Sequence, residues 1–455
     1  MAELLVSLGA KGVRLVAPAD ASFADLCNSY TGVKENANPS VVALPDSAEQ
    51  VQAVVQECIA TGKQIAVRGG GHDMYKRYTK PGAVLVDLRS LKGVSVSADK
   101  KTATVGAGLT SEQLLAELEP QGLQAVTGTG ATVGFAGWSM GGGYGPLDSR
   151  YGIGAHQIVG AKVVNGEGKL IQADDRLLKA VRGGAAFFGI VVELTIKVYP
   201  LDGIQSGVFL FESADLAKTV STVLNAYNEL AKDGMPDNLC VLPIIMPFPN
   251  AGVVFALSYI WSGPASDESR AWADKIGAFA PRLPGPPIQT TTMLNILRNL
   301  TKMIRQHVRG NCHSASITHL SAQAIDVLAT QAAKIPAAGN GGFSLHIVRT
   351  DSPSCSSTAP SSVTPYNTPH VSIDILGIVD IAGSDEVERA VVSWAQEARD
   401  ELVKVDAVAN FTYLPFTHPT HLNLEGIYGE NLQFMRQIKK EQDPNNIFNN
   451  GLVRL

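Results

Sequence analysis

The chain has 455 residues, with 37 lysines and arginines against 42 aspartates and glutamates, so its formal net charge is −5. Apolar residues make up 45% and charged residues 17%, a composition that excludes intrinsic disorder. The small negative charge, with no dense block of Lys or Arg, argues against nucleic acid as the main partner. The five cysteines are scattered and form no C-x-x-C pair, which excludes a disulfide framework.

Targeting and membrane signals are weak in this sequence. Glu3 stands where a signal peptide carries positive charge, so we expect a cytoplasmic protein. Residues 239–264 carry no charge and are long enough to raise the question of a spanning helix. Pro243, Pro247 and Pro249 break this stretch, because a proline inside a helix costs about 3 kcal/mol. We therefore predict two buried strands there and no membrane partner.

Residues 40–200 alternate short apolar runs with amphipathic segments. Asp46 and Ser47 form a helix-start signal ahead of the first amphipathic segment. Residues 127–145 are rich in glycine and threonine and show little periodicity, which predicts a loop. The predicted helices are residues 49–60 and 111–118, and the predicted strands are residues 41–44, 65–67, 84–86, 102–105, 158–164 and 188–198.

After Pro200 longer strand patterns alternate with longer helical patterns. The predicted strands are residues 253–261, 342–348, 371–379 and 405–413, and the predicted helices are residues 294–308 and 430–441. A row of basic side chains starts on one face of the helix predicted over residues 294–308. This basic stripe is either a solvated face or the site of an anionic substrate or partner. The stripe consists of Arg298, Lys302, Arg305 and Arg309.

Three short motifs point to functions that their surroundings do not favour. Residues 128–134 match a nicotinamide-dinucleotide fingerprint, which must open a helix, whereas the glycines of residues 135–145 argue against a helix. Residues 137–141 match the G-x-S-x-G nucleophile elbow of hydrolases at Ser139, but a loop rather than a strand precedes the serine. His418 and His421 lack the third ligand of a zinc site, so we expect no metal.

The strongest signal is a pair of glycine loops. Arg68-Gly69-Gly70-Gly71-His72 follows a predicted strand, and three successive glycines let backbone N–H groups approach a pyrophosphate closely. His72 then stands at the far end of whatever these amides hold. Residues 128–145 have the same lack of side-chain bulk, which suits a flat ring stacked on the main chain. We interpret the two loops as one cofactor site rather than as tight turns.

Together these residues resemble the berberine-bridge-enzyme branch of the vanillyl-alcohol-oxidase flavoproteins. The resemblance covers nearly the whole chain and is carried by residues 68–72, 132–145, 182–191 and 443–448. It implies an α+β fold in which a two-part FAD-binding domain of PCMH type holds an inserted α/β substrate domain built on an antiparallel sheet. The implied FAD-binding domain is residues 1–203 and 405–455, and the implied substrate-binding domain is residues 204–404.

The same resemblance implies FAD held by one covalent bond, from His72 to the 8α-methyl group of the flavin. Many members add a second bond from a cysteine, whose place is taken here by Gly130. The implied cofactor-binding residues are Arg68, Gly69, Gly70, Gly71, His72, Gly128, Thr132, Val133, Gly134, Gly137, Gly141, Gly142, Gly143, Tyr144, Gly145, Ile190, Val191 and Asn410.

The catalytic base is the least defined part of the site. Many members carry a tyrosine base in a Y-x-N-Y pattern, which reads Val408-Ala409-Asn410-Phe411 here, so that base is absent. Hydride loss from an alcohol or amine needs a proton acceptor of suitable pKa. The remaining candidates, all in or near the covering sheet, are Tyr413, His370, His313 and Tyr366.

We therefore expect an FAD-dependent oxidoreductase that acts on a small, largely apolar organic molecule of specialised metabolism. Val133 lies where the family sets oxygen access, and its modest side chain favours an oxidase with O2 as the electron acceptor. The missing tyrosine motivates an alternative, a cyclase or isomerase that keeps the flavin fold without a net redox step. A serine hydrolase at Ser139 is the third possibility.

Overall fold

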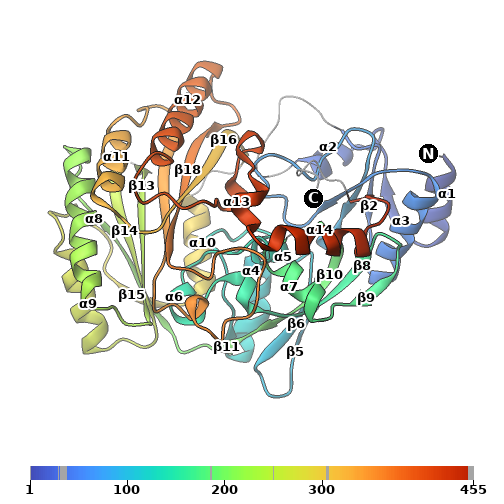
Figure 1. Ribbon diagram of the computed structural model, residues 1–455, viewed down its shortest axis with the longest axis horizontal. Coiled ribbons are helices and arrows are strands. Elements are labelled where there is room, and N and C mark those ends of the chain that lie inside the picture. The colour runs from blue at the N-terminus through green and yellow to red at the C-terminus, as the bar shows by residue number, and fades with distance from the viewer. Residues whose placement is uncertain are drawn as a thin grey trace.

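Two groups of strands lie side by side and divide the molecule into two lobes (Figure 1). The computed structural model describes residues 2–28, 30, 38–184, 187–248, 251–303 and 307–448. Both lobes combine helices with sheets, and the largest sheet is antiparallel throughout. The predicted α+β class is confirmed.

The N-terminal part of the chain forms the first sheet. Its elements are α1 (Ala2–Ala10), β1 (Arg14–Val16), α2 (Phe23–Cys27), β2 (Val41–Leu44), α3 (Ala48–Ala60), β3 (Ile65–Arg68) and β4 (Val84–Asp87). The strand order is β1-β2-β4-β3, and β4 runs parallel to both β2 and β3. Parallel strands need a crossover, which α3 supplies after the Ser47 hydroxyl caps its first turn by accepting the Gln50 N–H. The residues after β3 therefore leave the sheet at the carboxyl edge of its parallel strands.

A second, antiparallel sheet follows. Its elements are β5 (Val94–Val96), β6 (Thr102–Gly106), β8 (Ile158–Asn165), β9 (Leu170–Gln172) and β10 (Gly189–Lys197), in the order β5-β6-β10-β8-β9. The connecting elements are α4 (Ser111–Leu118), β7 (Leu123–Gln124), α5 (Phe135–Met140), α6 (Asp148–Tyr151), α7 (Asp175–Gly184) and β11 (Tyr199–Pro200). Helix α4 begins as predicted, because Thr110 and Gln113 form a capping box.

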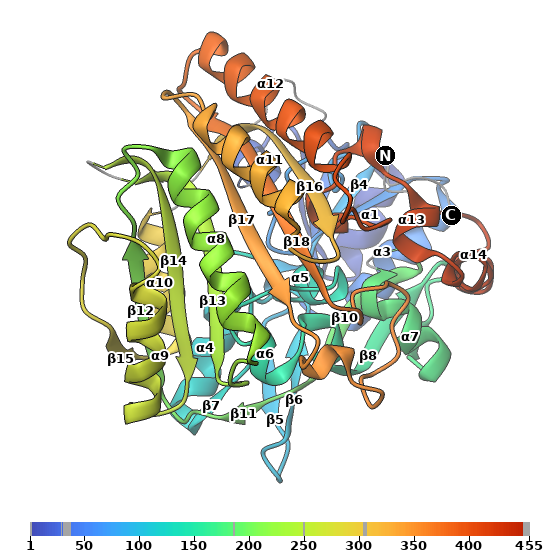
Figure 2. The same cartoon turned by 60° about the vertical axis from the view of Figure 1, so that its left-hand side comes forward.

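The other lobe is a seven-stranded antiparallel sheet with helices on its outer face (Figure 2). The strand order is β15-β12-β14-β13-β17-β18-β16. The strands are β12 (Ile204–Leu210), β13 (Leu239–Phe248), β14 (Gly252–Ser262), β15 (Gln289–Thr291), β16 (Val308–Ile317), β17 (Asn340–Val348) and β18 (His370–Asp380). The helices on the outer face are α8 (Leu216–Lys232), α9 (Asp267–Gly277), α11 (Ala322–Ala333) and α12 (Asp385–Leu402), whereas α10 (Met293–Met303) contacts α4 of the first lobe. The uncharged stretch forms β13 and β14, as predicted.

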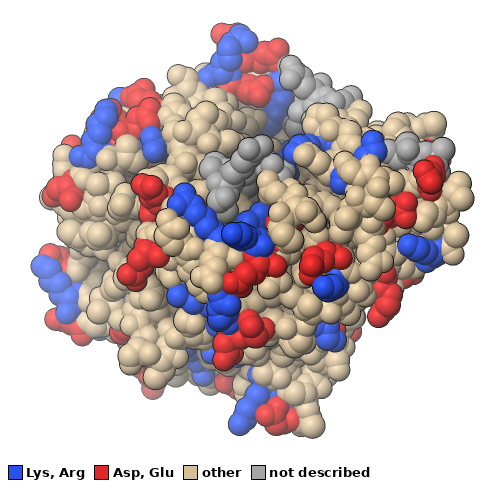
Figure 3. Space-filling view, turned by 45° about the vertical axis from the view of Figure 1, so that its right-hand side comes forward, with Lys and Arg blue, Asp and Glu red and all other residues tan. Residues whose placement is uncertain are grey.

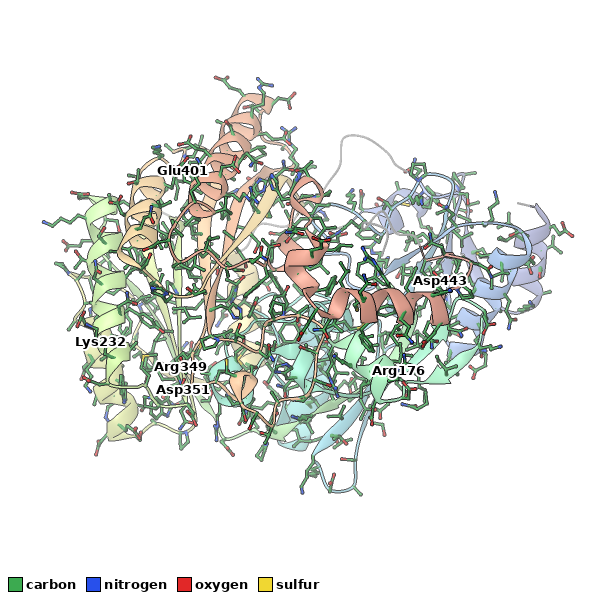
Figure 4. All side chains as sticks on the ribbon, in the orientation of Figure 1. Arg176, Lys232, Arg349, Asp351, Glu401 and Asp443 are labelled. Atoms are coloured by element: carbon green, nitrogen blue, oxygen red, sulfur yellow. The ribbon has the colours of Figure 1, made fainter. Side chains whose placement is uncertain are left out.

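The C-terminal segment returns to the first lobe. Its helices are α13 (Leu424–Tyr428) and α14 (Asn431–Gln442). Arg176 of α7 and Asp443, both labelled in Figure 4, lie where α14 docks, and the Arg176 guanidinium is 3.2 Å from Glu441. The Asp443 carboxylate accepts the main-chain N–H groups of Ile447 and Phe448, which is why an aspartate opens this motif.

Two sequence-predicted boundaries are wrong. The helix predicted over residues 294–308 ends at Met303, because Val308 begins β16; Ile304 and Arg305 lie outside the described residues. The strand predicted over residues 405–413 does not form, and only Val408 makes an isolated bridge, to Ile317. Beyond that bridge the Tyr413 N–H donates to the Ser314 hydroxyl rather than to the main chain, so the ladder stops.

The loop predicted over residues 127–145 contains a short helix, α5. Its single internal glycine, Gly137, costs about 1 kcal/mol relative to alanine. Phe135 and Trp138, whose ring centroids are 5.8 Å apart, are both buried, and each such burial contributes about 1.5–3 kcal/mol, which outweighs that cost. The sequence argument counted glycines and could not count the tertiary contacts of the two aromatic rings.

Surface charge on the visible face is mixed rather than concentrated (Figure 3). The basic stripe is largely paired: Arg298 contacts Glu112, and Arg309 is buried against Asp385 and Glu388. The reading of this stripe as an anion site is therefore not supported at either residue. Within the described ranges, no helix has both the length and the apolar character needed to cross a bilayer.

Candidate active site

The two predicted glycine loops meet main chain to main chain. A Cβ atom on Gly70 would lie 2.2 Å from the Gly134 nitrogen, and one on Gly134 would lie 2.4 Å from the Gly70 nitrogen. Only glycine permits so close an approach at both positions. The fold thus joins the loop after β3 to the loop before α5, although 60 residues separate His72 from Thr132.

His72 is held on two sides. Its Nε2 lies 2.7 Å from the Thr132 hydroxyl, and its ring stacks on Tyr30 with centroids 4.6 Å apart. Burial, with a smaller contribution from Arg68, lowers the pKa of His72 to about 4, so the ring is neutral near pH 7. Sequence reasoning missed Tyr30, which belongs to no motif and reaches the loop only through the tertiary fold.

The second loop lies beneath the seven-stranded sheet. Gly142 and Gly143 have φ of +117° and +75°, values that favour glycine. A Cβ on Gly142 would also lie 2.6 Å from the Tyr366 ring. Gly137, in contrast, is exposed and has no atom within 4 Å of the direction a side chain would take. The segment is therefore tightly packed on the sheet side and open beside Gly137.

Tyr144 stands at the centre of a group of polar and aromatic side chains, which we call the Tyr144 cluster. Its ring centroid is 4.7 Å from that of Tyr413, 5.4 Å from that of His346 and 5.8 Å from that of Tyr366. The cluster consists of Tyr144, His346, Tyr366, His370, Asp374 and Tyr413. Three of the four candidate bases, Tyr413, His370 and Tyr366, belong to it.

The hydrogen bonds of His370 fix the direction of its contact with Tyr144. His370 Nδ1 lies 2.6 Å from the Thr368 carbonyl oxygen, which can only accept, so Nδ1 carries the proton. Burial lowers the pKa of His370 to about 4, so the ring holds no second proton. Its Nε2, 2.6 Å from the Tyr144 hydroxyl, therefore accepts the Tyr144 O–H. The Tyr144 oxygen keeps lone pairs for another donor.

Asp374 is the group that the sequence analysis missed. It lies on β18 as a buried residue, 4% exposed, and its Oδ2 is 3.1 Å from His346 Nε2. Within the described chain its Oδ1 has no hydrogen-bond partner. One signal could have found it: His370, Ser372 and Asp374 alternate with apolar residues, so they share one face of the strand.

Tyr413 keeps its proton in this setting. Burial first, and the nearby Asp374 second, raise the pKa of Tyr413 far above its usual value. A phenol that stays protonated can donate a hydrogen bond but is a poor base. This favours a donor role over the role of base expected for Tyr413 from the sequence.

His313 is not placed with the other candidates, and the sequence expectation for it is not supported. His313 lies on β16 and pairs with Ile375 of β18, whereas its neighbour Ser314 pairs with Asp374. Paired residues share a face and successive residues alternate, so His313 and Asp374 point to opposite faces of the sheet. Its neighbours are His418 and His421, each with a ring centroid 5.5 Å away. No three potential ligands converge on a metal position among the described residues.

Acid is expected to weaken the fold through His313. Burial first, and then His418, His421 and Arg399, lower the pKa of His313 from 6.5 to about 4. Below pH 6.5 the imidazole of His313 binds a proton in the unfolded chain but not in the folded chain. The free energy of unfolding therefore decreases as the pH falls from 6.5 towards 4. His313→Leu should reduce the fall in Tm by about 1–2 °C per pH unit in that window. The exposed residue His319, changed to leucine, is the control; an equal effect there would contradict the assignment.

The remaining predicted positions are distributed around the loops. The Arg68 guanidinium donates to the Leu26 carbonyl oxygen and lies over the Tyr78 ring, so it ties the first loop to α2. Ile190 and Val191 are buried in β10, and Asn410 is exposed in the segment before Tyr413. Gly69, Gly71, Gly128, Gly141 and Gly145 lie in the two loops, as expected.

The hydrolase interpretation of Ser139 is wrong. Ser139 lies inside α5 with no exposed surface, and its hydroxyl donates to the Ala136 carbonyl oxygen at 3.1 Å. A nucleophile elbow needs an exposed serine at a turn between strand and helix. The hydroxyl of Ser139 is instead satisfied within its own helix and cannot reach a substrate.

The residues present fit a flat dinucleotide cofactor. Side chains are absent where the two loops meet, and an open position lies beside Gly137. A neutral histidine stands next to that junction, and unpartnered polar atoms of Ser372 and Asp374 lie on the sheet. These are the features that a bound isoalloxazine ring and its pyrophosphate require: main-chain contact, a flat open face and polar groups at one edge.

Comparison with known proteins identifies this cofactor. Residues 39–174 match the family model described as an FAD binding domain. The chain is 29% identical over 425 residues to the FAD-linked oxidoreductase aurO of Gibberella zeae, covering 90% of this chain and 80% of that protein. It is 32% identical over 236 residues to (R)-6-hydroxynicotine oxidase of Paenarthrobacter nicotinovorans, covering 50% of this chain and 51% of that protein.

Solved structures share the whole fold. BBE-like 1 of Physcomitrella patens has a TM-score of 0.83 at 20% identity, over 98% of this chain and 97% of that chain. Glucooligosaccharide oxidase of Acremonium strictum, which carries 6-S-cysteinyl, 8α-N1-histidyl FAD, has a TM-score of 0.83 at 18% identity, over 98% of this chain and 97% of that chain. The chain is an FAD-linked oxidoreductase that shares its fold with the berberine-bridge-enzyme-like proteins.

Proposed function

We propose that this protein carries FAD bonded once, through His72, and oxidises a small, largely apolar organic molecule of specialised metabolism with O2 as the acceptor. The observation that carries the proposal is the Tyr144 cluster, in which Tyr144 of the second glycine loop meets polar side chains of the seven-stranded sheet. FAD, when bound, accepts a hydride from a substrate carbon. The proposal keeps residues 1–203 and 405–455 as the FAD-binding domain and residues 204–404 as the substrate-binding domain.

Main chain from both loops would hold the cofactor. Gly70 and Gly134 bring the two backbones together, and Gly137 leaves room beside them. The other glycines predicted to bind the cofactor lie in the same two loops. In this arrangement the protein contacts the cofactor mostly through amides, which offer hydrogen-bond donors without side-chain bulk.

Asp374 is the proposed proton acceptor. Loss of hydride from a carbon that bears O–H or N–H requires that proton to leave. The Asp374 Oδ2 atom is oriented by His346, and its Oδ1 atom has no partner in the described residues. Tyr413, which keeps its proton, would donate a hydrogen bond to the substrate, and the Tyr144 oxygen would accept one.

Aromatic rings support a largely apolar substrate. Tyr144, Tyr366 and Tyr413 form a hydrophobic cluster together with the partly buried Phe411 and Phe416. A flat molecule with one polar function matches such a surface, because rings supply stacking area and the few polar groups fix orientation. Val133, half-buried beside the loop junction, is the residue to which we assign oxygen access.

The His72 bond has a direct test. The purified protein is expected to be yellow and to keep its yellow colour in the pellet after acid precipitation. His72→Ala should release all its flavin into the acid supernatant, because the nitrogen that holds it is gone. Visible spectra of pellet and supernatant measure this, with His319→Ala as the control. Acid-stable flavin in His72→Ala would place the bond elsewhere.

Anaerobic substrate trials test the redox step. Bleaching of the flavin by a candidate substrate, and hydrogen peroxide on admission of air, are expected for an oxidase. Product formed with no bleaching would instead support the cyclase or isomerase alternative. A protein with no flavin after expression in riboflavin-replete cells would refute the proposal.

A further inference from the structure

We propose that Thr132 and Tyr30 are positioning residues for flavin attachment, which hold the His72 ring so that its Nδ1 lone pair meets the flavin 8α-carbon. The inference rests on the proposed covalent FAD. It explains why the His72 ring would be reactive towards the flavin. The two residues come from different parts of the chain: Thr132 lies in the second cofactor loop, and Tyr30 belongs to no motif.

The Thr132 contact selects one form of the ring. A neutral imidazole has one N–H and one lone pair, and His72 Nε2 lies 2.7 Å from the Thr132 hydroxyl. No hydrogen bond of the described residues involves Nδ1. A proton on Nδ1 would therefore be a donor left without an acceptor in a half-buried site, which costs more than an idle lone pair. Nε2–H donating to Thr132 Oγ1 is thus the favoured arrangement, and it leaves the Nδ1 lone pair free.

Tyr30 restrains the plane of the same ring. The two rings are stacked, with centroids 4.6 Å apart and planes 17° from parallel. The main chain of Tyr30 is itself anchored, because its N–H donates to the Gly71 carbonyl oxygen at 3.2 Å and its carbonyl oxygen accepts the Val308 N–H at 3.0 Å. Tyr30 therefore ties the glycine loop to the start of β16, and a side-chain substitution leaves both main-chain bonds in place.

The attachment chemistry uses this arrangement. One C–N bond forms between Nδ1 and the 8α-carbon, and one C–H bond at that carbon and the Nε2–H bond break. The two hydrogens, counted as two protons and two electrons, are taken up by the flavin ring, and dioxygen then removes them as hydrogen peroxide. Positive charge builds on the imidazole as the C–N bond forms, and the hydrogen bond to Thr132 Oγ1 stabilises it. Burial keeps the pKa of His72 near 4, so the lone pair is available at neutral pH.

The experiment compares matched pairs of variants. The full chain is isolated from riboflavin-limited cells and mixed with FAD, and samples are quenched in acid over time. The readout is the acid-stable fraction of the bound flavin, measured across a range of pH. Thr132→Val removes the hydroxyl and keeps the shape, whereas Thr132→Ser keeps the hydroxyl. Tyr30→Leu removes the stacked ring, whereas Tyr30→Phe keeps it.

Thr132→Val is expected to bind FAD but to attach it about tenfold more slowly, the effect of one lost hydrogen bond to the reacting ring. Thr132→Ser should restore the wild-type rate. Tyr30→Leu should also be slow, and Tyr30→Phe should not be. Attachment in Thr132→Val at the wild-type rate would overturn the proposal. So would a Thr132→Val protein that binds no FAD, because the hydroxyl would then serve binding rather than orientation of His72.

The outcomes also separate this inference from the proposed function. FAD that is bound by the wild-type protein, bleached by substrate and released by acid would overturn the attachment inference and leave the oxidoreductase in place. A wild-type protein that binds no FAD would overturn both.

Discussion

Gly70→Ala is expected to remove nearly all FAD from the protein. The new Cβ atom would lie 2.2 Å from the Gly134 nitrogen and 2.6 Å from its Cα, and both atoms belong to main chain that cannot rotate aside. The two glycine loops would have to separate. Loss of two main-chain hydrogen bonds to the cofactor, at about 1 kcal/mol each, would weaken binding by about thirtyfold. The ratio of flavin to protein absorbance measures this.

Gly93→Ala is the matched control for Gly70→Ala. Gly93 belongs to the same lobe, and a Cβ atom there would meet no atom within 4 Å. Its flavin content should equal that of the wild-type protein. Circular dichroism of both variants would establish that each is folded. Full flavin content in a folded Gly70→Ala protein would contradict the role assigned to the loop junction.

Asp374→Asn is expected to slow reduction of the flavin by substrate by about 10²–10⁴-fold, the usual contribution of a general base. The amide keeps the size of the side chain and its contact with His346, but it cannot take up a proton at neutral pH. The rate constant of anaerobic flavin bleaching in a stopped-flow instrument measures the step directly. Flavin content should not change, since Asp374 lies on the sheet rather than in either glycine loop.

Tyr413→Phe provides the comparison for Asp374→Asn. It removes a hydrogen-bond donor and leaves the carboxylate, so a loss of about tenfold is expected. Unimpaired bleaching in Asp374→Asn would move the role of base to the pair formed by Tyr144 and His370. In that pair the Tyr144 hydroxyl lies 2.6 Å from His370 Nε2, so the histidine could take up the hydroxyl proton.

Local sequence signals predicted the regular elements of the first lobe closely. The strand at Val41–Leu44 and the helix at Ser111–Leu118 have the predicted bounds. Each depends on information held within a few residues: apolar runs for the strand, and the capping box of Thr110 with Gln113 for the helix. Prediction was poorer where long-range contacts decide, as at residues 135–140, which form α5 because Phe135 and Trp138 are buried.

The choice among the histidines shows a second limit. His313 and His370 both occur in strand-like runs, and nothing local distinguishes them. Alternation in a strand states which residues share a face, but it does not state which face turns towards the cofactor. The register of β16 with β18 decides this: His313 turns away, and Asp374, which the sequence analysis did not consider, turns with His370 towards Tyr144.

The sequence by itself determined the chemistry of the cofactor loops, because residues 68–72 carry their function in consecutive positions and glycine has a fixed physical meaning. It also carried the resemblance from which FAD and the fold were predicted. Only the tertiary structure brought Tyr30 and Thr132 to His72 and assembled the Tyr144 cluster from four separate segments. The physical reason is that such contacts depend on strand register and loop packing, which are set by burial across the whole chain rather than by any one stretch of it.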